Sequence, residues 1–359
     1  MSTDHRREKI AADSSMTRHP KESYRLKKIV EAFSKITITV VGDFVADEFV
    51  FGEISRVSRE APVLILKYRE KSVVPGGGAN AVNNLADLGI NVLPAGIVGN
   101  DEAGRLLLRG FRKKHVPVSG ILKGPGYATP TKTRILAGMT HSSRQQLVRV
   151  DREPESEPDR NQKREIVLAA REYARASDAV LISDYGYGAA TPAILNAIRE
   201  KGRLDNLPVV LDSRHRMLQY SGVTAATPNE PEVEEALLMK IGHDWSQLCS
   251  AASQVISRMS LQSLVITRGR DGMAAFSGDQ KPVDIPIYGS DQVADVTGAG
   301  DTVIATFTAA LAAGATTEDA AHLANYAGGI VVMKRGTATV SREELLQAIE
   351  HTPAMTRSH

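Results

Sequence analysis

The chain has 359 residues, of which 42% are hydrophobic, so it is long enough to bury a large core in one or two domains. Only 5% of the residues are aromatic, a composition that favours helices packed on a sheet over an aromatic-rich β-sandwich. The formal net charge of +2 argues against binding of nucleic acid or an anionic membrane through bulk positive charge.

The two ends of the chain differ from its body. Residues 1–28 carry a net charge of +4, which leaves −2 for the other 331 residues. Residues 1–22 are polar and lack hydrophobic periodicity, so we expect a disordered tail there and a second short tail at 351–359. A single cysteine, Cys249, excludes an internal disulfide and favours a cytoplasmic location. We expect no membrane segment, because no hydrophobic run approaches the ~18 residues that one needs.

Helical and strand patterns alternate along most of the chain. A helix is expected over residues 24–33, followed by a buried strand over 36–41. Further helices are expected over 80–88, 104–114, 163–175, 192–201, 230–240, 245–259 and 301–313. Further strands are expected over 91–98, 179–183, 209–212 and 264–267. Such repetition predicts a mostly parallel sheet with helices on both faces.

Two stretches interrupt this alternation. Residues 48–68 and 120–150 are rich in Thr, Val, Ile and Arg and have no helical period. They are typical of antiparallel strands inserted between α/β units. We therefore expect one domain over residues 23–350, with a small β-appendage inserted at about 48–70 and 120–150.

The strongest chemical motif is Asp295-Val-Thr-Gly-Ala-Gly-Asp301, which leads directly into a hydrophobic helix. Free backbone N–H groups at a helix start bind anions, and glycine lets a phosphate approach them closely. Asp301 would lie in the first helical turn, where a base for a substrate hydroxyl is needed in phosphoryl transfer. An ordinary helix with an acidic first turn explains the motif about equally well.

A second glycine cluster, Pro75-Gly-Gly-Gly-Ala-Asn80, also precedes a helix. Consecutive glycines are useful where a ligand passes close to the backbone, and the Asn80 amide suits a sugar hydroxyl. A flexible turn is the alternative interpretation. Neither cluster has the spacing of a Walker A loop or of a dinucleotide-binding fingerprint.

Polar side chains also follow several expected strands. Ligands of open α/β sheets bind at the carboxyl ends of strands, so these residues are candidates for a site. They are Asp43, Asp184, Asp212, Asn229, Glu232 and Thr267. Basic residues at 131–134 and 144–149 could bind a substrate phosphate, or could form a solvated face of a hairpin.

Taken in order, these motifs resemble those of the ribokinase-like (PfkB-type) carbohydrate kinases. PGGGAN looks like the first family signature and DVTGAGDTVIATF like the second; TPNEPE, VITRG and LANYAGGIVV fall in family order. The resemblance covers about residues 36–350. It implies a three-layer α/β sandwich with a mostly parallel central sheet and a small β-sheet lid, and an ATP- and Mg²⁺-dependent kinase.

Within that family the chain is most similar to the heptose 7-phosphate kinases of lipopolysaccharide precursor synthesis. The matching stretches are GEISRVSREAPV (52–63), ATPTKTRILA (128–137), RQQLVRVDRE (144–153), LISDYGYG (181–188) and KRGTATVSREEL (334–345). This similarity implies transfer of phosphate to the anomeric hydroxyl of D-glycero-β-D-manno-heptose 7-phosphate. Many such proteins carry a fused nucleotidyltransferase domain, and we expect only the kinase half here.

The resemblance also implies roles for the catalytic and cofactor groups. Asp301 would be the general base, and an anion hole would be formed by Gly298, Ala299 and Gly300. Mg²⁺ and its waters would be organised by Asn229 and Glu232. ATP would be contacted by Thr267 and Gly269, with Asn325 beside the adenine. A monovalent cation such as K⁺ would lie near Asp295 and Gly336.

The acceptor site is implied in the same way. The sugar and its phosphate would be bound by Asp43, Gly76, Gly77, Asn80, Lys132, Arg134, Arg149 and Asp184. The lid would cover the sugar and serve as the surface of a homodimer.

One position departs from the group. The heptose kinases have a lysine in SDY-[GA]-K-G, where this chain has Tyr187. A tyrosine does not replace that cation, but Arg214 or Arg216 in LDSRHR might compensate for it. The departure keeps open a different acceptor, such as a hexose, an amino sugar or a nucleoside, and a catalytically idle sensor of sugar or nucleotide.

Overall fold

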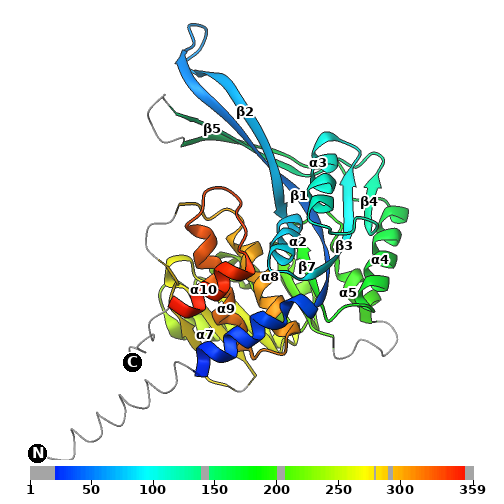
Figure 1. Ribbon diagram of the computed structural model, residues 1–359, viewed down its shortest axis with the longest axis vertical. Coiled ribbons are helices and arrows are strands. Elements are labelled where there is room, and N and C mark those ends of the chain that lie inside the picture. The colour runs from blue at the N-terminus through cyan, green and yellow to red at the C-terminus, as the bar shows by residue number, and fades with distance from the viewer. Residues whose placement is uncertain (1–20, 139–144, 200–206, 279, 290–293, 352–359) are drawn as a thin grey trace, which may run out of the picture.

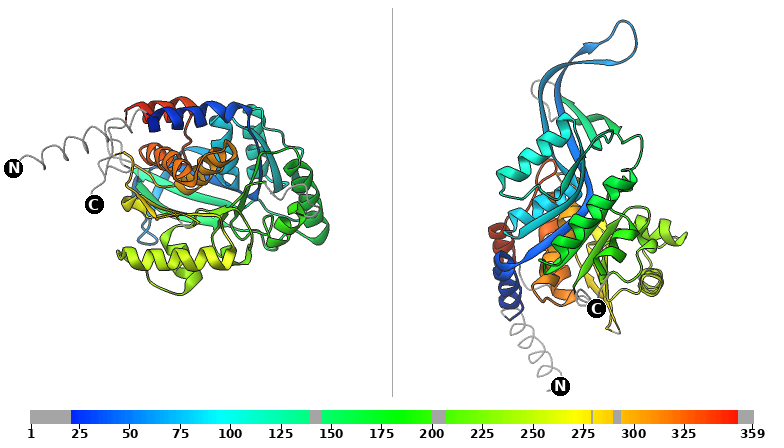
Figure 2. Two further views of the ribbon diagram at one scale, coloured as in Figure 1. Left: turned by 90° about the horizontal axis from the view of Figure 1, so that it is seen from below. Right: turned by 90° about the vertical axis from the view of Figure 1, so that its right-hand side faces the viewer.

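A mostly parallel β-sheet runs through the centre of the molecule, with helices on both faces (Figures 1 and 2). The computed structural model describes residues 21–138, 145–199, 207–278, 280–289 and 294–351. The central strands lie in the order β12-β11-β10-β9-β8-β7-β1-β3-β4. Neighbours from β10 to β4 are parallel, whereas β11 and β12 are added antiparallel at one edge. The predicted fold class is confirmed.

The central strands are β1 (Thr37–Val57), β3 (Asn91–Gly99), β4 (Ile121–Gly124), β7 (Ala179–Asp184), β8 (Val209–Ser213), β9 (Ala225–Ala226), β10 (Ser263–Thr267), β11 (Met273–Ser277) and β12 (Val283–Ile285). Three further strands, β2 (Leu64–Gly77), β5 (Thr131–Gly138) and β6 (Gln145–Arg152), join the outer part of β1.

The helices are α2 (Gly78–Asp87), α3 (Glu102–Lys113), α4 (Arg160–Ala174), α5 (Pro192–Arg199), α6 (Glu230–Leu237), α7 (Trp245–Met259), α8 (Ala299–Ala312), α9 (Thr317–Val332) and α10 (Arg342–His351). Residues 21–32 are also helical and continue into the 3₁₀ turn η1 (Phe33–Lys35). Two more 3₁₀ turns are η2 (Met217–Gln219) and η3 (Gly269–Asp271).

Alternation along the central strands produces a separate hydrophobic core on each face of the sheet. Val40 and Leu181 point into one core, together with residues of α2, α8, α9 and α10. Their chain neighbours Val41 and Ile182 point into the other, against α4, α5 and α7. The helix at 21–32 buries the predicted face on the first core, with Val30 and Phe33 fully buried.

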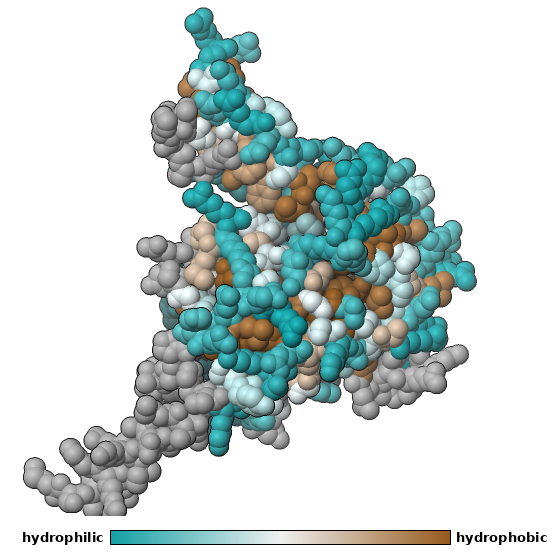
Figure 3. Space-filling view, in the orientation of Figure 1, coloured by the Kyte–Doolittle hydropathy of each residue, from teal (hydrophilic) through white to brown (hydrophobic). Residues whose placement is uncertain are grey.

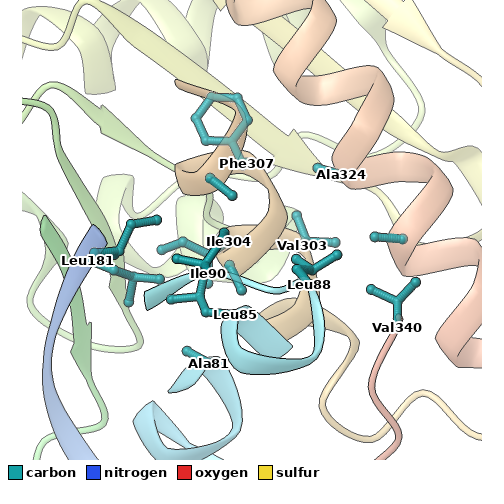
Figure 4. Close-up of a cluster of buried hydrophobic side chains, with 14 of the residues drawn as sticks. Ala81, Leu85, Leu88, Ile90, Leu181, Val303, Ile304, Phe307, Ala324 and Val340 are labelled. Carbon is teal, nitrogen blue, oxygen red and sulfur yellow. The ribbon is translucent and has the colours of Figure 1, made fainter. Parts of the chain in front are cut away.

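Helices α2 and α8 pack directly against each other on one face of the central sheet (Figure 4). Leu85 and Leu88 of α2 lie in the same buried cluster as Val303, Ile304 and Phe307 of α8. The first turns of the two helices also lie side by side, because Asn80 of α2 donates hydrogen bonds to Gly298 and Asp301 at the start of α8. The two glycine motifs of the sequence thereby meet.

Strand β1 belongs to two sheets. Residues Thr37–Asp43 pair with β3, and most of them also with β7, whereas the chain from Phe44 onward pairs with β2 and, from Ala46, with β5. The outer part of β1 with β2, β5 and β6 forms a projecting sheet that we call the lid (Figure 1).

The boundaries predicted from the sequence were wrong for some of these elements. The strand expected to end at Val41 continues to Val57, and β2 extends to Gly77. The segment 120–150 is not lid throughout, because Ile121–Gly124 pairs with β3 in the central sheet. The second lid segment therefore begins at Thr131.

The predicted tails fall largely outside the described residues, which begin at Lys21 and end at His351. Lys21 and Glu22 belong to the first helix and His351 to α10, so the expected tails are shorter by these residues. In the described part of the chain, no helix combines the length and hydrophobicity that a membrane crossing requires.

Candidate active site

Asp301 lies at the centre of the site, in the first turn of α8 and only 4% exposed. One carboxylate oxygen, Oδ1, accepts a hydrogen bond from the Tyr185 hydroxyl at 2.7 Å. The other, Oδ2, accepts one from Asn80 Nδ2 at 3.0 Å. Burial raises the pKa of Asp301 to about 6, although these two hydrogen bonds lower it. The carboxylate is therefore fixed in direction and more basic than a solvated one, as a general base should be.

Asn80 connects α2 to α8 through hydrogen bonds. Its Nδ2 also lies 3.3 Å from the Gly298 carbonyl oxygen, and its Oδ1 accepts from Asn84 Nδ2 at 3.1 Å. Asn84 Oδ1 in turn accepts from the Thr302 hydroxyl at 2.9 Å. Because Asn80 is fully buried and both ends of its amide are engaged, it helps to position Asp301. Its expected contact with the sugar stays a prediction.

Asp43 also acts within the protein. Its carboxylate accepts three backbone hydrogen bonds, from Tyr185 and Tyr187 at Oδ2 and from Ala189 at Oδ1, at 2.8–3.0 Å. The side chain is fully buried, and its expected contact with the sugar stays a prediction. Asp43 shapes the loop that presents Tyr185 to Asp301.

Asp184 is a structural anchor as well, and is only 1% exposed. It accepts hydrogen bonds from the hydroxyls of Ser213 and Tyr220, both at 3.0 Å, and from the guanidinium of Arg216. Both carboxylate oxygens of Asp184 are thus engaged within the protein, and its predicted role in acceptor binding stays a prediction. Arg216 is therefore paired with Asp184, and Arg214 is the arginine of the LDSRHR segment that forms no salt bridge among the described residues.

Asp47, which the sequence analysis missed, lies beside the site at the start of the lid. It is 5% exposed and accepts from Arg134 Nη1 at 2.6 Å and from the Thr337 hydroxyl at 3.2 Å. Its position could have been found from period-two spacing, because Asp43 and Asp47 lie four residues apart on one strand.

Gly76 and Gly77 give these groups room. A Cβ on Gly76 would stand 2.5 Å from Asp47 Oδ2, and Gly77 adopts φ +54° where the chain turns into α2 beneath Tyr185. Their predicted place at the site is therefore explained by close packing of the chain, and direct contact with the sugar remains a proposal.

The predicted phosphate-binding cations differ in their surroundings. Arg134 is paired with Asp47, and Arg149, half exposed, is paired with Asp151 at 2.9 Å. Lys132 instead places its ammonium 5.3 Å from the centre of the Tyr185 ring. Arg214 lies over the same ring, at 4.4 Å.

The start of α8 is where the sequence predicts an anion-binding turn. Gly298, with φ +79°, precedes the helix, and a Cβ there would stand 2.6 Å from Asn80 Nδ2. A Cβ on Gly300 would meet nothing within 4 Å, so the space in front of the helix is open. Ala299 N–H already donates to the Val296 carbonyl at 3.2 Å. The amides of Gly300 and Asp301, which have no intrahelical acceptor, are thus the better donors to an anion.

Asn229 and Glu232 form a capping box at the start of α6, each side chain bonded to the backbone N–H of the other at 2.8–2.9 Å. One Glu232 oxygen stays available for a cation. Burial raises the pKa of Glu232, and burial together with the Glu232 charge raises that of Asp212 well above its usual range. Asp212 and Glu232 are thus neighbouring, partly buried carboxylates whose pKa values Arg214 lowers, and they are candidate oxygen ligands for a divalent cation.

The residues expected to contact ATP and K⁺ occupy three places. Thr267 ends β10 opposite Asn229, and Gly269, with φ +57°, begins η3. Asn325 is buried in α9 and donates to the Pro286 carbonyl at 2.8 Å, which ties it to the loop after β12. Asp295 and Gly336 are brought together, because the Gly336 N–H donates to Asp295 Oδ2 at 3.1 Å.

These features are those of a phosphotransferase, and comparison with known proteins decides the family. Residues 38–344 match the model of the pfkB family carbohydrate kinases. The chain belongs to this family. It is a carbohydrate kinase.

The curated relatives include the bifunctional protein HldE of Geobacter metallireducens, 41% identical over 312 residues, and that of Geobacter sulfurreducens, 39% identical over 315. These alignments cover 87% and 88% of the kinase but only 62% and 63% of the relatives. The chain thus spans less than two thirds of their length.

Solved structures share the fold at low sequence identity. Arabidopsis thaliana ribokinase complexed with ribose and ATP has a TM-score of 0.68 and 20% identity, covering 88% of the kinase and 99% of that chain. Escherichia coli phosphofructokinase-2 in complex with potassium has a TM-score of 0.70 and 16% identity, covering 88% and 98%.

Proposed function

We propose that this carbohydrate kinase uses ATP to phosphorylate D-glycero-β-D-manno-heptose 7-phosphate at O1, forming the 1,7-bisphosphate. The observation that carries the reaction type is the buried Asp301 carboxylate, held by two donors beside the open first turn of α8. The acceptor is supported by the similarity to HldE proteins at about 40% identity.

Asp301 would accept the proton of the acceptor hydroxyl as its oxygen attacks the γ-phosphorus of ATP. The bond from that phosphorus to the bridging oxygen breaks, and ADP leaves. With a pKa near 6, Asp301 is ionised at neutral pH and still basic enough to receive a proton. The α8 amides would stabilise the charge on the transferred group.

A divalent cation would be held by Glu232, Asn229 and Asp212. When bound, Mg²⁺ would neutralise charge on the ATP phosphates. Asp295 and Gly336 are proposed for a monovalent cation, and Thr267, Gly269 and Asn325 for the nucleotide. Among these, Asn325 would act through the Pro286 loop that it holds.

The lid is proposed to cover the acceptor and to form a homodimer surface. Several hydrophobic side chains on it are 41–66% exposed, and hydrophobic residues are visible along the lid in Figure 3. They are Val57, Val63, Leu64, Tyr68, Leu147, Val148 and Val150. Contact with a second lid would remove this hydrophobic surface from water.

The deciding experiment is an ADP-release screen over heptose 7-phosphate, unphosphorylated heptose, hexoses, amino sugars and nucleosides, with ³¹P NMR of the product. A new anomeric phosphate signal from heptose 7-phosphate is the expected result. Turnover of unphosphorylated sugars alone would contradict the acceptor and favour another member of the family, as Tyr187 in place of lysine allows. Binding of ATP and sugar without any product would instead indicate a sensor.

A further inference from the structure

Most cations around the candidate site are already neutralised by a carboxylate. The pairs are Arg134–Asp47, Arg149–Asp151 and Arg216–Asp184. In the first and third pairs the carboxylate is also buried, so separation would leave an unpaired buried charge. These arginines are therefore poorly suited to bind a substrate phosphate.

Lys132 and Arg214 are different. Within the described ranges, neither forms an ion pair. Both lie over the ring of Tyr185, with the Lys132 ammonium 5.3 Å and the Arg214 guanidinium carbon 4.4 Å from its centre. Burial and the Arg214 charge lower the pKa of Lys132, although Asp47 and Asp151 raise it. Two like charges thus share one aromatic ring, and no carboxylate is within salt-bridge distance of either among the described residues, although the charges of Asp212 and Asp301 raise the pKa of Arg214 from farther away.

We propose that Lys132 and Arg214 together bind the phosphate monoester that the acceptor sugar already carries. The inference rests on the proposed function, because it names how that enzyme recognises its substrate class. A dianion between the two side chains would give each of them a direct ion-pair partner. It would also replace the cation lost at Tyr187, and Arg214 rather than Arg216 supplies the compensation.

The position of this Lys132–Arg214 site suits a substrate with a phosphate at one end and a reacting hydroxyl at the other. The ring of Tyr185 carries the two cations, while its hydroxyl donates to Asp301 at 2.7 Å. One side chain therefore connects the phosphate site to the catalytic base. A sugar bound by its phosphate would be oriented toward Asp301, and such positioning is a large part of catalysis.

The two cations come from different parts of the fold. Lys132 belongs to the lid strand β5, whereas Arg214 follows β8 of the central sheet. A phosphate bound by both would fasten the lid to the body. The lid would then close most firmly over a phosphorylated acceptor, which protects ATP from water when the wrong sugar is present.

The same chemistry could recognise a phosphate of ATP, so the test must separate the two sources. Steady-state kinetics of Lys132→Met, Arg214→Gln and the double variant would be measured with heptose 7-phosphate and with ATP. Lys67→Met, which removes an exposed lid cation on β2, is the matched control. Calorimetry would give the Kd of heptose 7-phosphate and of the same heptose without phosphate.

Each single substitution is expected to raise KM and Kd for heptose 7-phosphate about 10- to 100-fold, the usual effect of a lost charge-assisted hydrogen bond. KM for ATP, the Kd of the unphosphorylated heptose and all values for Lys67→Met should stay within about threefold. A KM for heptose 7-phosphate that stays within threefold in both single variants overturns the site and leaves the kinase reaction standing. A rise confined to the KM for ATP assigns the cations to the nucleotide and also overturns it.

Failure of the proposed function has a different signature. If the wild type binds heptose 7-phosphate and the variants do not, but no product forms, the Lys132–Arg214 site stands and the proposed reaction is wrong. If the wild type shows no preference for the phosphorylated sugar in binding or turnover, both are wrong.

Discussion

The junction of α2 and α8 differs from the lid-facing side of the site in burial and in hydrogen bonding. At the junction, Asn80, Asn84, Asp301 and Thr302 are at most 4% exposed and bonded to one another. On the lid, all of β6 is exposed, and Lys132 forms no salt bridge among the described residues. Asp301 and its two hydrogen-bond donors are thus in place without substrate, whereas on the lid side the proposed acceptor phosphate would supply the missing ion-pair partner. Substitutions at the junction should therefore affect turnover or folding, and substitutions facing the lid should affect specificity.

The largest effect is expected at the base itself. Asp301→Asn keeps the shape and one acceptor oxygen but removes the proton acceptor, so kcat should fall about 100-fold or more. Stopped-time ADP assays with circular dichroism as a folding control would measure it. Near-normal turnover by a folded variant would remove Asp301 from the mechanism.

Asp43→Asn tests whether the junction side depends on a buried anchor. The amide keeps a single acceptor oxygen for three backbone N–H groups, so the unfolding free energy should fall by about 2–3 kcal/mol. Urea denaturation would measure it, with the exposed Glu343→Gln as a control. Equal midpoints for the two variants would contradict the anchoring role.

Tyr185→Phe tests the connection between the two regions. The Tyr185 hydroxyl lowers the pKa of Asp301, so its loss should raise that pKa above about 6. Because the base must be ionised, activity is lost as the pH falls through this pKa, and the acid limb of kcat/KM should move to higher pH. We expect a loss of about tenfold at pH 7. A lower kcat with an unmoved pH profile would reduce Tyr185 to a packing residue.

The smallest effect is expected for Gly300→Ala. A Cβ there meets nothing within 4 Å, and alanine favours a helix over glycine, so stability should be unchanged or rise by up to about 1 kcal/mol. Turnover should nevertheless fall several-fold, because the methyl group narrows the approach to the α8 amides. Calorimetric unfolding and kinetics on one preparation would test both halves, and unaltered kcat would argue against an anion at this turn.

The sequence predicted the layered fold because its signals are local. Alternating periodicity located the strands and helices, and the glycine motif with Asp301 marked the start of α8. It could not show what the side chains contact. Asn80 and Asp301 are 221 residues apart, and Asp43 and Tyr185 are 142 apart. For that reason it could not show that Asp43, Asn80 and Asp184, which it assigned to the substrate, also form hydrogen bonds within the protein.

Two residues were missed for related reasons. Asp47 lies where a strand passes from the central sheet into the lid, and the sequence analysis ended that strand at Val41. The sequence analysis considered Tyr185 only as part of the motif around Tyr187. Its role depends on the hydrogen bond from its hydroxyl to Asp301, which the structure shows and the sequence does not. A polar residue repeated at strand spacing after Asp43 was the one signal that pointed to Asp47.

The continuity of β1 has a mechanical consequence. One strand carries both the anchor Asp43 in the central sheet and the lid residue Asp47, with no loop between them. We therefore expect movement of the lid to bend β1 rather than to turn about a loop hinge, and the register shifts at Phe51/Gly52 and Ile54/Arg56 are where the strand should bend most easily. Because the same strand pairs with β3 and β7, such bending would also act on the central sheet. Engineering that stiffens or relaxes β1 should thus tune the rate of opening while leaving the residues that perform the chemistry untouched.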